Sequence, residues 1–334
     1  MKSLLRFRPD ILITALVAAA IIASFLPVRG QTADGLELVT QASVALLFFL
    51  HGARLLPQTV FAGFANWRLH VTILACSFVM FPLLAIPIGW LVPSVLSPEI
   101  YAGFIFLCIL PSTIQSSIAF TSIAGGNVAA AVCAASASNM LGVVLTPLLA
   151  ALLLQKEGGV DPHAIESIML QLLAPFALGQ LMQRWVGDWV RTHRKLLGFV
   201  ERGSIVSVAY LAFSDAVVGG IWTQLEMRDL VGMVIIVAAL LAAVLLLTRF
   251  IGSNLGFSRE DQIAIMFCGS KKSMGSGLPM ANIIFAGQAL GLIVLPMMLY
   301  HQLQLIVCAI IAKRYSENRL RASDIELKDT IEAG

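Results

Sequence analysis

Two neighbouring lysines, Lys271 and Lys272, lie inside an apolar stretch of the sequence, and packing alone explains them poorly. The stretch from Phe267 to Pro279 reads FCGSKKSMGSGLP and contains three glycines and a proline, residues that weaken or interrupt helices. A charge at the centre of a bilayer costs at least ~2.5 kcal/mol on insertion scales, so two such charges require a cavity or partners. A long side chain can reach the membrane interface, but the pair lies too deep for both lysines to do so. We therefore expect a binding site here, formed by Gly269, Ser270, Lys271, Lys272 and Ser273.

A second apolar stretch is interrupted in a similar way. After the apolar residues Ile105 to Leu110, the sequence continues from Pro111 to Ser117 as PSTIQSS. Proline removes a backbone donor, and backbone groups freed at membrane depth must be satisfied by protein, water or a ligand. Broken helix ends then offer dipoles and carbonyls to a solute, although a simple proline kink is the structural alternative. The expected site residues in this stretch are Pro111, Thr113, Gln115, Ser116 and Ser117.

Other polar residues inside apolar stretches complete the candidate site. Small residues such as Ser136 and Ser138 allow helices to pack closely, whereas Asn139 costs more to bury and indicates a cavity. Asp215 is the other clear acid within a span, and it forms either a functional pair with a lysine or a purely structural ion pair. His301 is interpreted as a satisfied core histidine rather than as a proton relay.

The composition places these residues in a membrane protein. The chain has 334 residues, of which 58% are apolar and only 12% charged, whereas soluble domains carry about 25% charged residues. A span needs about 20 apolar residues. The net charge is +3, and the basic residues lie in short loops rather than in one patch, so we expect no nucleic-acid partner. The five cysteines lie in apolar runs without a CxxC pair, which favours packing over a metal site or disulfides, and no cofactor is expected.

The apolar stretches predict an all-α protein with ten membrane spans, and the first is too long for a signal peptide. With the N-terminus inside, 17 of the 22 lysines and arginines lie in inside segments, three lie outside, and Lys271 and Lys272 lie within a span. This bias predicts cytoplasmic termini and a location in the cytoplasmic (inner) membrane. The expected spans are residues 9–27, 38–57, 69–93, 99–122, 127–154, 164–186, 203–222, 229–251, 261–285 and 288–312.

Ten spans divide into two halves of five, which would have opposite orientations, as in inverted-repeat transporters. The expected repeats are residues 1–160 and 161–315, followed by a cytoplasmic tail at 316–334. The interrupted stretches are the fourth span of each half, which is the visible sign of this symmetry. The sequence contains no GxxxxGK[ST] motif, so ATP is not the expected energy source.

At these residues the chain resembles the bile acid:sodium symporter superfamily, over nearly its whole length. The stretch Pro111 to Ser117 matches the family's broken fourth helix, with Ser-Ser in place of the usual Ser-Asn at its end. Gly126 to Val128 matches the turn before the fifth helix, and Leu172 to Gln180 matches the family's Leu-x-x-Pro-x-x-x-Gly-Gln pattern. The resemblance implies core and panel domains interleaved in the sequence, with helices 4 and 9 crossing in the core. It also adds Asn127 to the expected site.

The family's sodium motif is altered in this sequence. In the sodium-coupled members, ions bind beside the crossing, and the ninth helix contributes a Glu-x-Gly-Met-Gln-Asn-Ser motif. When this motif is anchored on Gly269 and Ser273, its glutamate falls at Phe267 and its Gln-Asn pair falls at Lys271 and Lys272. The acidic sodium ligand is therefore absent, and the chain resembles a divergent branch of the superfamily.

This substitution leads to a prediction about the lysines. An ammonium group repels a nearby cation strongly where the effective dielectric is low. We predict that Lys271 or Lys272 occupies the space where relatives hold sodium, solvated by carbonyls at the breaks and by hydroxyls such as Ser116. Adjacent helical residues diverge by about 100°, so the other lysine is expected to face the substrate cavity or Asp215. The lysine is then either a group for proton coupling or a fixed counter-charge.

The predicted function is secondary transport of a small organic anion by alternating access. The coupling ion, sodium or proton, is left open by the sequence. A passive channel or facilitator and a non-transporting regulatory membrane protein are the alternatives. An enzyme is not expected, because the chain has no HExxH, no GxSxG and no paired carboxylates.

Overall fold

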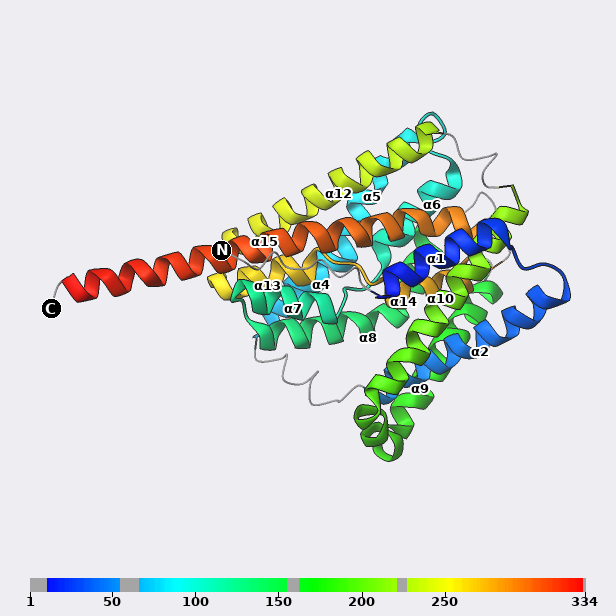
Figure 1. The fold of residues 1–334 in the computed structure, drawn as a ribbon, viewed down its shortest axis with the longest axis horizontal. Coiled ribbons are helices and arrows are strands. Elements are labelled where there is room, and N and C mark those ends of the chain that lie inside the picture. Colours follow the sequence, from blue (N-terminus) through cyan, green and yellow to red (C-terminus); the bar gives the residue numbers. More distant parts are fainter. Residues whose placement is uncertain (1–10, 55–65, 155–161, 221–226, 287, 333–334) are drawn as a thin grey trace. The chain divides into compact units, whose positions relative to one another are not determined.

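The protein is helical throughout the described part of the chain. The structure is a computed structural model that describes residues 11–54, 66–154, 162–220, 227–286 and 288–332. Within these ranges the chain forms helices joined by short turns and contains no strand (Figure 1). The predicted boundary between the repeats, at residues 160 and 161, falls in a stretch of which only Pro162 onward is described.

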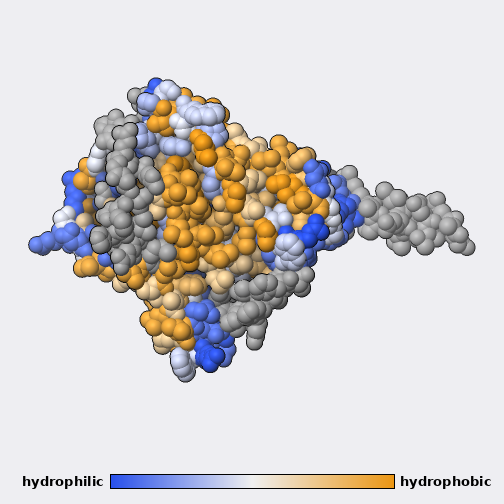
Figure 2. Space-filling model, turned by 180° about the vertical axis from the view of Figure 1, so that it is seen from behind, coloured by the Kyte–Doolittle hydropathy of each residue, from blue (hydrophilic) through white to orange (hydrophobic). Residues whose placement is uncertain are grey.

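Six of the described helical segments are long and apolar enough to cross a membrane. They are Gln31–Arg54, Trp67–Leu91, Val128–Leu153, Leu196–Val218, Met227–Asn254 and Leu290–Arg319. Two shorter apolar helices lie at Thr14–Phe25 and Pro98–Ile109. Broad hydrophobic areas are visible on the surface in Figure 2, and many large hydrophobic side chains of the described helices are exposed. These features are those of an integral membrane protein, because apolar surface on this scale requires contact with lipid.

One compact unit combines the described parts of residues 1–54, 166–226 and 278–294. Helix α10 (Arg194–Val218) packs against α1 (Ile11–Phe25) and α2 (Gln31–Arg54). Helix α9 (Pro162–Thr192) approaches α2 through two glycines. A methyl group added to Gly52 would lie 2.1 Å from the Phe176 carbonyl oxygen, and one added to Gly179 would lie 2.0 Å from the Phe49 carbonyl oxygen. Glycine is therefore required at both positions, as in other membrane helix contacts.

The second compact unit combines the described parts of residues 55–165, 227–277 and 295–334. Its elements are α4 (Trp67–Ala75), the π-helical turn η2 (Cys76–Met80), α5 (Phe81–Ala85), the 3-10 turn η3 (Ile86–Leu91), α6 (Pro98–Ile109), α7 (Gln115–Ala124), α8 (Val128–Leu153), α12 (Met227–Asn254), α13 (Arg259–Gly269) and most of α15 (Leu290–Glu332). Helix α13 is central to it and packs against α4, α7, α8 and α12. All five cysteines belong to this unit and are free thiols.

Both interruptions predicted from the sequence are present. Helix α6 ends at Ile109 and α7 begins at Gln115, while α13 ends at Gly269 and α14 (Met274–Ile284) follows. The breaks are shorter than the polar stretches in the sequence, because the later residues of each stretch already form the next helix. The stretch predicted as a tail, residues 316–334, continues helix α15 as far as Glu332.

Candidate functional site

The first break is held by side chains of α8. The chain leaves the helical conformation after Ile109, so carbonyl and amide groups near the break lose their helical partners. Thr146 Oγ1 donates to the Ile109 carbonyl oxygen at 2.9 Å, and Asn139 Nδ2 donates to that of Ser112 at 2.6 Å. Ser138 Oγ accepts a hydrogen bond from the Ser112 amide at 3.0 Å. Helix α8 therefore supplies the partners that Pro111 and its neighbours cannot find within their own helix.

The second break is held by side chains of α15. Gln304 is fully buried, and its side-chain amide pairs with both sides of the Lys272 backbone. Its Oε1 accepts from the Lys272 amide at 3.0 Å, and its Nε2 donates to the Lys272 carbonyl at 3.0 Å. The Tyr300 hydroxyl donates to the Ser270 carbonyl oxygen at 2.8 Å. The backbone of the lysine pair is thus fixed from a neighbouring helix.

The two breaks also bond directly to each other, and the hydroxyls of the first break satisfy carbonyls at the end of α13. Three hydrogen bonds join them: Ser112 Oγ to Cys268 O at 2.7 Å, Ser117 Oγ to Phe267 O at 3.3 Å, and Ser273 N to Pro111 O at 2.8 Å. The last bond runs from the second break back to the first. Because each break supplies partners for the other, the two interrupted helices form one joined centre.

The Lys272 ammonium occupies the middle of this centre. Its Nζ lies 2.7 Å from each of three backbone carbonyl oxygens, those of Ser77, Cys108 and Leu110. An ammonium has three donors, so all are satisfied. Cys108 and Leu110 lie at the C-terminal, partially negative end of α6, and Ser77 lies in the π-helical turn, where the shifted register alters the carbonyl pairing. The Phe81 ring centroid lies 4.0 Å from Nζ.

The Lys271 side chain is equally buried but differently surrounded. Its Nζ lies 3.6 Å from the centroid of the Phe120 ring and 5.9 Å from that of Phe267. Within the described part of the chain it has no hydrogen-bond acceptor. The aromatic faces attract the cation, but they leave its three N–H groups without acceptors. The adjacent lysines therefore differ sharply: one is coordinated and one is not.

Four of the predicted site residues, Thr113, Gln115, Ser116 and Ser136, form no hydrogen bond with either lysine in the described structure. Thr113 Oγ1 lies 2.7 Å from Ser116 Oγ and 3.1 Å from Ser117 Oγ, which closes the first turn after the break. Ser116 thus bonds to Thr113 rather than solvating an ammonium. Gln115 is exposed and Ser136 half-buried, and neither hydrogen-bonds to a break in the described structure.

Neither Asn127 nor Asp215 forms a described hydrogen bond to the two breaks. Asn127 caps α8, since its Oδ1 accepts from the Ala130 amide at 3.0 Å, and its Nδ2 donates to Asp261 Oδ1 at 2.8 Å. Twelve residues of helix, or about 18 Å, separate it from Asn139. Its visible role is to join the beginnings of α8 and α13. Asp215 is exposed on α10 and belongs to the other unit.

Several residues at the centre were not singled out from the sequence. Thr146, Tyr300 and Gln304 hold the breaks, and Ser77 contributes only its carbonyl. Tyr300 and Gln304 are four residues apart, which places them on one face of a helix. Such a polar face in an apolar span could have indicated that these two residues contact another polar element. Ser77 gave none, because a backbone carbonyl has no side-chain signature.

Comparisons with known proteins bear on what this centre does. A model of the SBF-like CPA transporter family matches residues 10–317. The chain is 51% identical over 316 residues to an uncharacterised protein of Pseudomonas aeruginosa, covering 94% of this chain and 95% of that protein. It is 48% identical over 301 residues to "Putative symporter YfeH" of Escherichia coli (strain K12), with coverages of 90% and 91%. It is 28% identical over 323 residues to sodium/bile acid cotransporter 7 of Rattus norvegicus, with coverages of 93% and 94%.

Proposed function

The chain belongs to the SBF-like CPA transporter family, and we propose that it is a secondary transporter that moves a small organic anion across the membrane by alternating access. Membership of a transporter family, apolar membrane-crossing helices and relatives named as symporter and cotransporter make it an integral membrane transporter. The proposal on mechanism rests on a single observation. The Lys272 ammonium lies where the two helix breaks bond to each other, 2.7 Å from each of three carbonyl oxygens.

In this proposal Lys272 stands in for a coupling cation. Three carbonyl oxygens that converge on one point form an electronegative site suited to a small cation, and here an ammonium on the chain itself fills it. Two unit charges about 4 Å apart repel by about 4 kcal/mol at an effective dielectric constant of about 20. A sodium ion beside Lys272 would therefore be strongly disfavoured. The relatives named sodium/bile acid cotransporters carry sodium in their names, but we propose that this chain works without it.

The charge of Lys271 supports an anionic substrate. A buried ammonium without a hydrogen-bonding partner is costly unless an anion or water reaches it. In the described structure the rings of Phe120 and Phe267 and the thiols of Cys268 and Cys308 lie beside Lys271, and its ammonium has no hydrogen-bond acceptor. A carboxylate arriving near the crossing would gain from this charge. We propose that Lys271 contributes the attraction for the substrate, while Lys272 holds the breaks together.

The order of the elements supports an inverted repeat. Two helices of the first unit (α1 and α2) are followed in the second unit by an unbroken segment, a broken pair and a long helix. From α9 onward the same order recurs, with α9 and α10, then α12, the broken pair α13 and α14, and α15. With each broken pair counted as one span, this order supports ten spans in two five-span repeats. An even number of spans puts both termini on one side of the membrane, and we propose the cytoplasmic side from the lysine and arginine distribution. Alternating access would then move one unit against the other.

Uptake into proteoliposomes tests the proposed function. The purified chain would be assayed with labelled taurocholate, pyruvate and succinate, in sodium and in potassium buffers of equal ionic strength. We expect saturable uptake of at least one anion that is equal in both buffers and lost in Lys271→Gln. Flux that never saturates would instead indicate a channel, and sodium-dependent uptake would contradict the role given to Lys272.

A further inference from the structure

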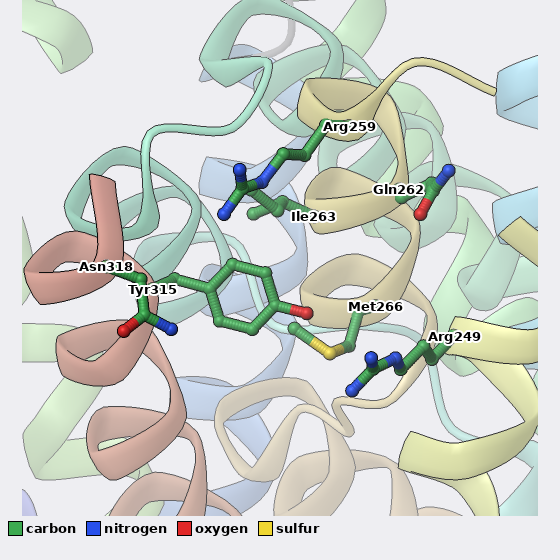
Figure 3. A pocket seen from close by; sticks show the side chains of 7 residues that line it. All are labelled: Arg249, Arg259, Gln262, Ile263, Met266, Tyr315 and Asn318. Atoms are coloured by element: carbon green, nitrogen blue, oxygen red, sulfur yellow. The ribbon is translucent and has the colours of Figure 1, made fainter. Parts of the chain in front are cut away.

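A polar cavity of about 490 Å³ opens in the second unit, apart from the helix crossing. Its walls come from the end of α12, the beginning of α13 and the middle of α15 (Figure 3). Ile263 and Met266 form its apolar floor. The polar side chains around it are Arg249, Arg259, Gln262, Tyr315 and Asn318. A cavity of this size is large enough for a small polar group.

The charge of the cavity is positive and unbalanced. Arg249 and Arg259 come from different helices, are both exposed, and form no ion pair or hydrogen bond with any described residue. No acidic side chain lines the cavity. Among the neighbouring acids, Asp261 accepts a hydrogen bond from Asn127, and Glu260 lies outside the lining. Arg249 and Arg259 lie towards opposite ends of the lining (Figure 3), and each guanidinium has free donors that can bind a phosphate oxygen pair through two parallel bonds.

The depth of Arg249 places this site at the level of lipid headgroups. Helix α12 carries no charged residue between Asp229 and Arg249. These twenty residues of helix span about 30 Å, the thickness of the hydrocarbon core of a bilayer. If Asp229 lies at one border of the hydrocarbon, Arg249 lies at the other, where lipid phosphates are found. The lysine and arginine distribution assigns this border to the cytoplasmic side.

A shallow, open and mostly apolar groove adjoins the cavity on the outside of α12. It is lined by Leu246, Leu247, Phe250 and Ser253, and it shares Arg249 with the cavity. Leu246 is 69% exposed and Phe250 is 61% exposed, as expected of side chains that face lipid. A soluble phosphate compound would use the cavity alone, whereas a lipid would use both the cavity and the groove.

We propose that the cavity binds the phosphate group of an anionic phospholipid, with one acyl chain lying in the groove along α12. Basic pockets between membrane helices on the cytoplasmic side are suited to such headgroups. The bound lipid would bridge α12, α13 and α15, and α13 leads directly into the break that carries the lysines. The lipid would thus steady the helices around the crossing. This site goes beyond the proposed transport function and does not depend on it.

Native mass spectrometry of the full chain in neutral detergent tests the site. The protein would be titrated with phosphatidylglycerol, with phosphatidylcholine of the same acyl chains, and with glycerol 3-phosphate, which lacks acyl chains. We expect a saturable one-to-one adduct with phosphatidylglycerol at least about tenfold tighter than with phosphatidylcholine. Glycerol 3-phosphate should bind far more weakly than the lipid.

Variants locate the adduct on the protein. Arg249→Gln and Arg259→Gln should each weaken phosphatidylglycerol binding about tenfold, a loss of about 1.4 kcal/mol. The phosphatidylglycerol affinity of Arg249→Lys should lie between those of Arg249→Gln and wild type, because lysine keeps the charge but loses the bidentate geometry. Arg314→Gln is the matched control, since Arg314 is an exposed arginine of α15 outside the lining. Equal melting temperatures without added lipid would show that all variants are folded.

Three outcomes would overturn the proposal. They are equal affinity for phosphatidylcholine and phosphatidylglycerol, phosphatidylglycerol binding that survives both glutamine variants, and binding of glycerol 3-phosphate as tight as that of the lipid. The last result would assign the cavity to a soluble phosphate compound.

Discussion

The two helix breaks differ in what they bring to their crossing. The first break and the end of α6 offer carbonyl oxygens and hydroxyls, are uncharged, and are held by α8. The second break offers the charge, on Lys272, and is held by Gln304 and Tyr300 of α15. Neither break is satisfied alone, because the carbonyls need a cation and the ammonium needs acceptors. The cation at this centre is therefore the Lys272 side chain itself. One break supplies the acceptors and the other supplies the ammonium donor, and this complementarity joins the two breaks.

The largest expected effect comes from removing the charge of the second break. Lys272→Met keeps an unbranched side chain only one atom shorter but leaves three buried carbonyls without a donor, and we expect the free energy of unfolding to fall by about 3 kcal/mol or more. The measurement is unfolding of the purified protein in detergent. Lys271→Met is the matched control, because Lys271 is equally buried and forms no hydrogen bond among the described residues. Equal losses in the two variants would remove the distinction between the lysines.

A smaller effect is expected when the support of the second break is removed. Gln304→Leu leaves the amide and carbonyl of Lys272 buried and unpaired, which costs about 1–3 kcal/mol. Gln302→Leu, two residues earlier and half-buried without a described bond to either break, should change stability little. The same unfolding measurement applies. A larger loss in Gln302→Leu than in Gln304→Leu would show that α15 does not hold this break.

A single substitution in α8, which holds the first break, should lower the free energy of unfolding less than Gln304→Leu does. Thr146→Val removes the one hydroxyl that bonds to the Ile109 carbonyl, and we expect a loss of about 1 kcal/mol. Ser136→Ala on the same helix serves as the control and should be close to neutral, because Ser136 is half-buried and forms no hydrogen bond to either break in the described structure. A loss in Thr146→Val as large as that in Lys272→Met would mean that α8, and not the ammonium, dominates the centre.

The smallest effect on stability is expected at Lys271. Lys271→Met loses no described hydrogen bond and exchanges a buried charge for an apolar side chain, so the free energy of unfolding should stay equal or rise. Anion uptake should nevertheless fall at least about tenfold if this ammonium attracts the substrate. Stability and uptake are measured on the same preparation. Normal uptake in a stable Lys271→Met protein would exclude Lys271 from substrate attraction.

The sequence predicted the breaks because their causes are local. Pro111 removes a backbone donor within its own helix, and the glycines and lysines after Cys268 disfavour a continuous apolar helix. Which of the two lysines is bound by carbonyls depends instead on the positions of the end of α6 and of the π-helical turn in the folded protein. Two adjacent residues of the same type do not reveal this in the sequence. Asn127 was grouped with the expected site through the family resemblance, whereas its side chain caps α8 and bonds to Asp261 at the beginning of α13. The partners on α15 are distant in sequence, and only their four-residue spacing hints at a shared face.

Sodium dependence of the wild-type protein decides whether Lys272 stands in for an ion. Substrate uptake is measured in proteoliposomes while sodium replaces potassium at constant ionic strength, with the melting temperature followed in parallel. If the ammonium fills the cation site between the carbonyls of Ser77, Cys108 and Leu110, neither quantity changes as sodium rises. A saturable increase of uptake and melting temperature with sodium, in protein that retains Lys272, would contradict that role.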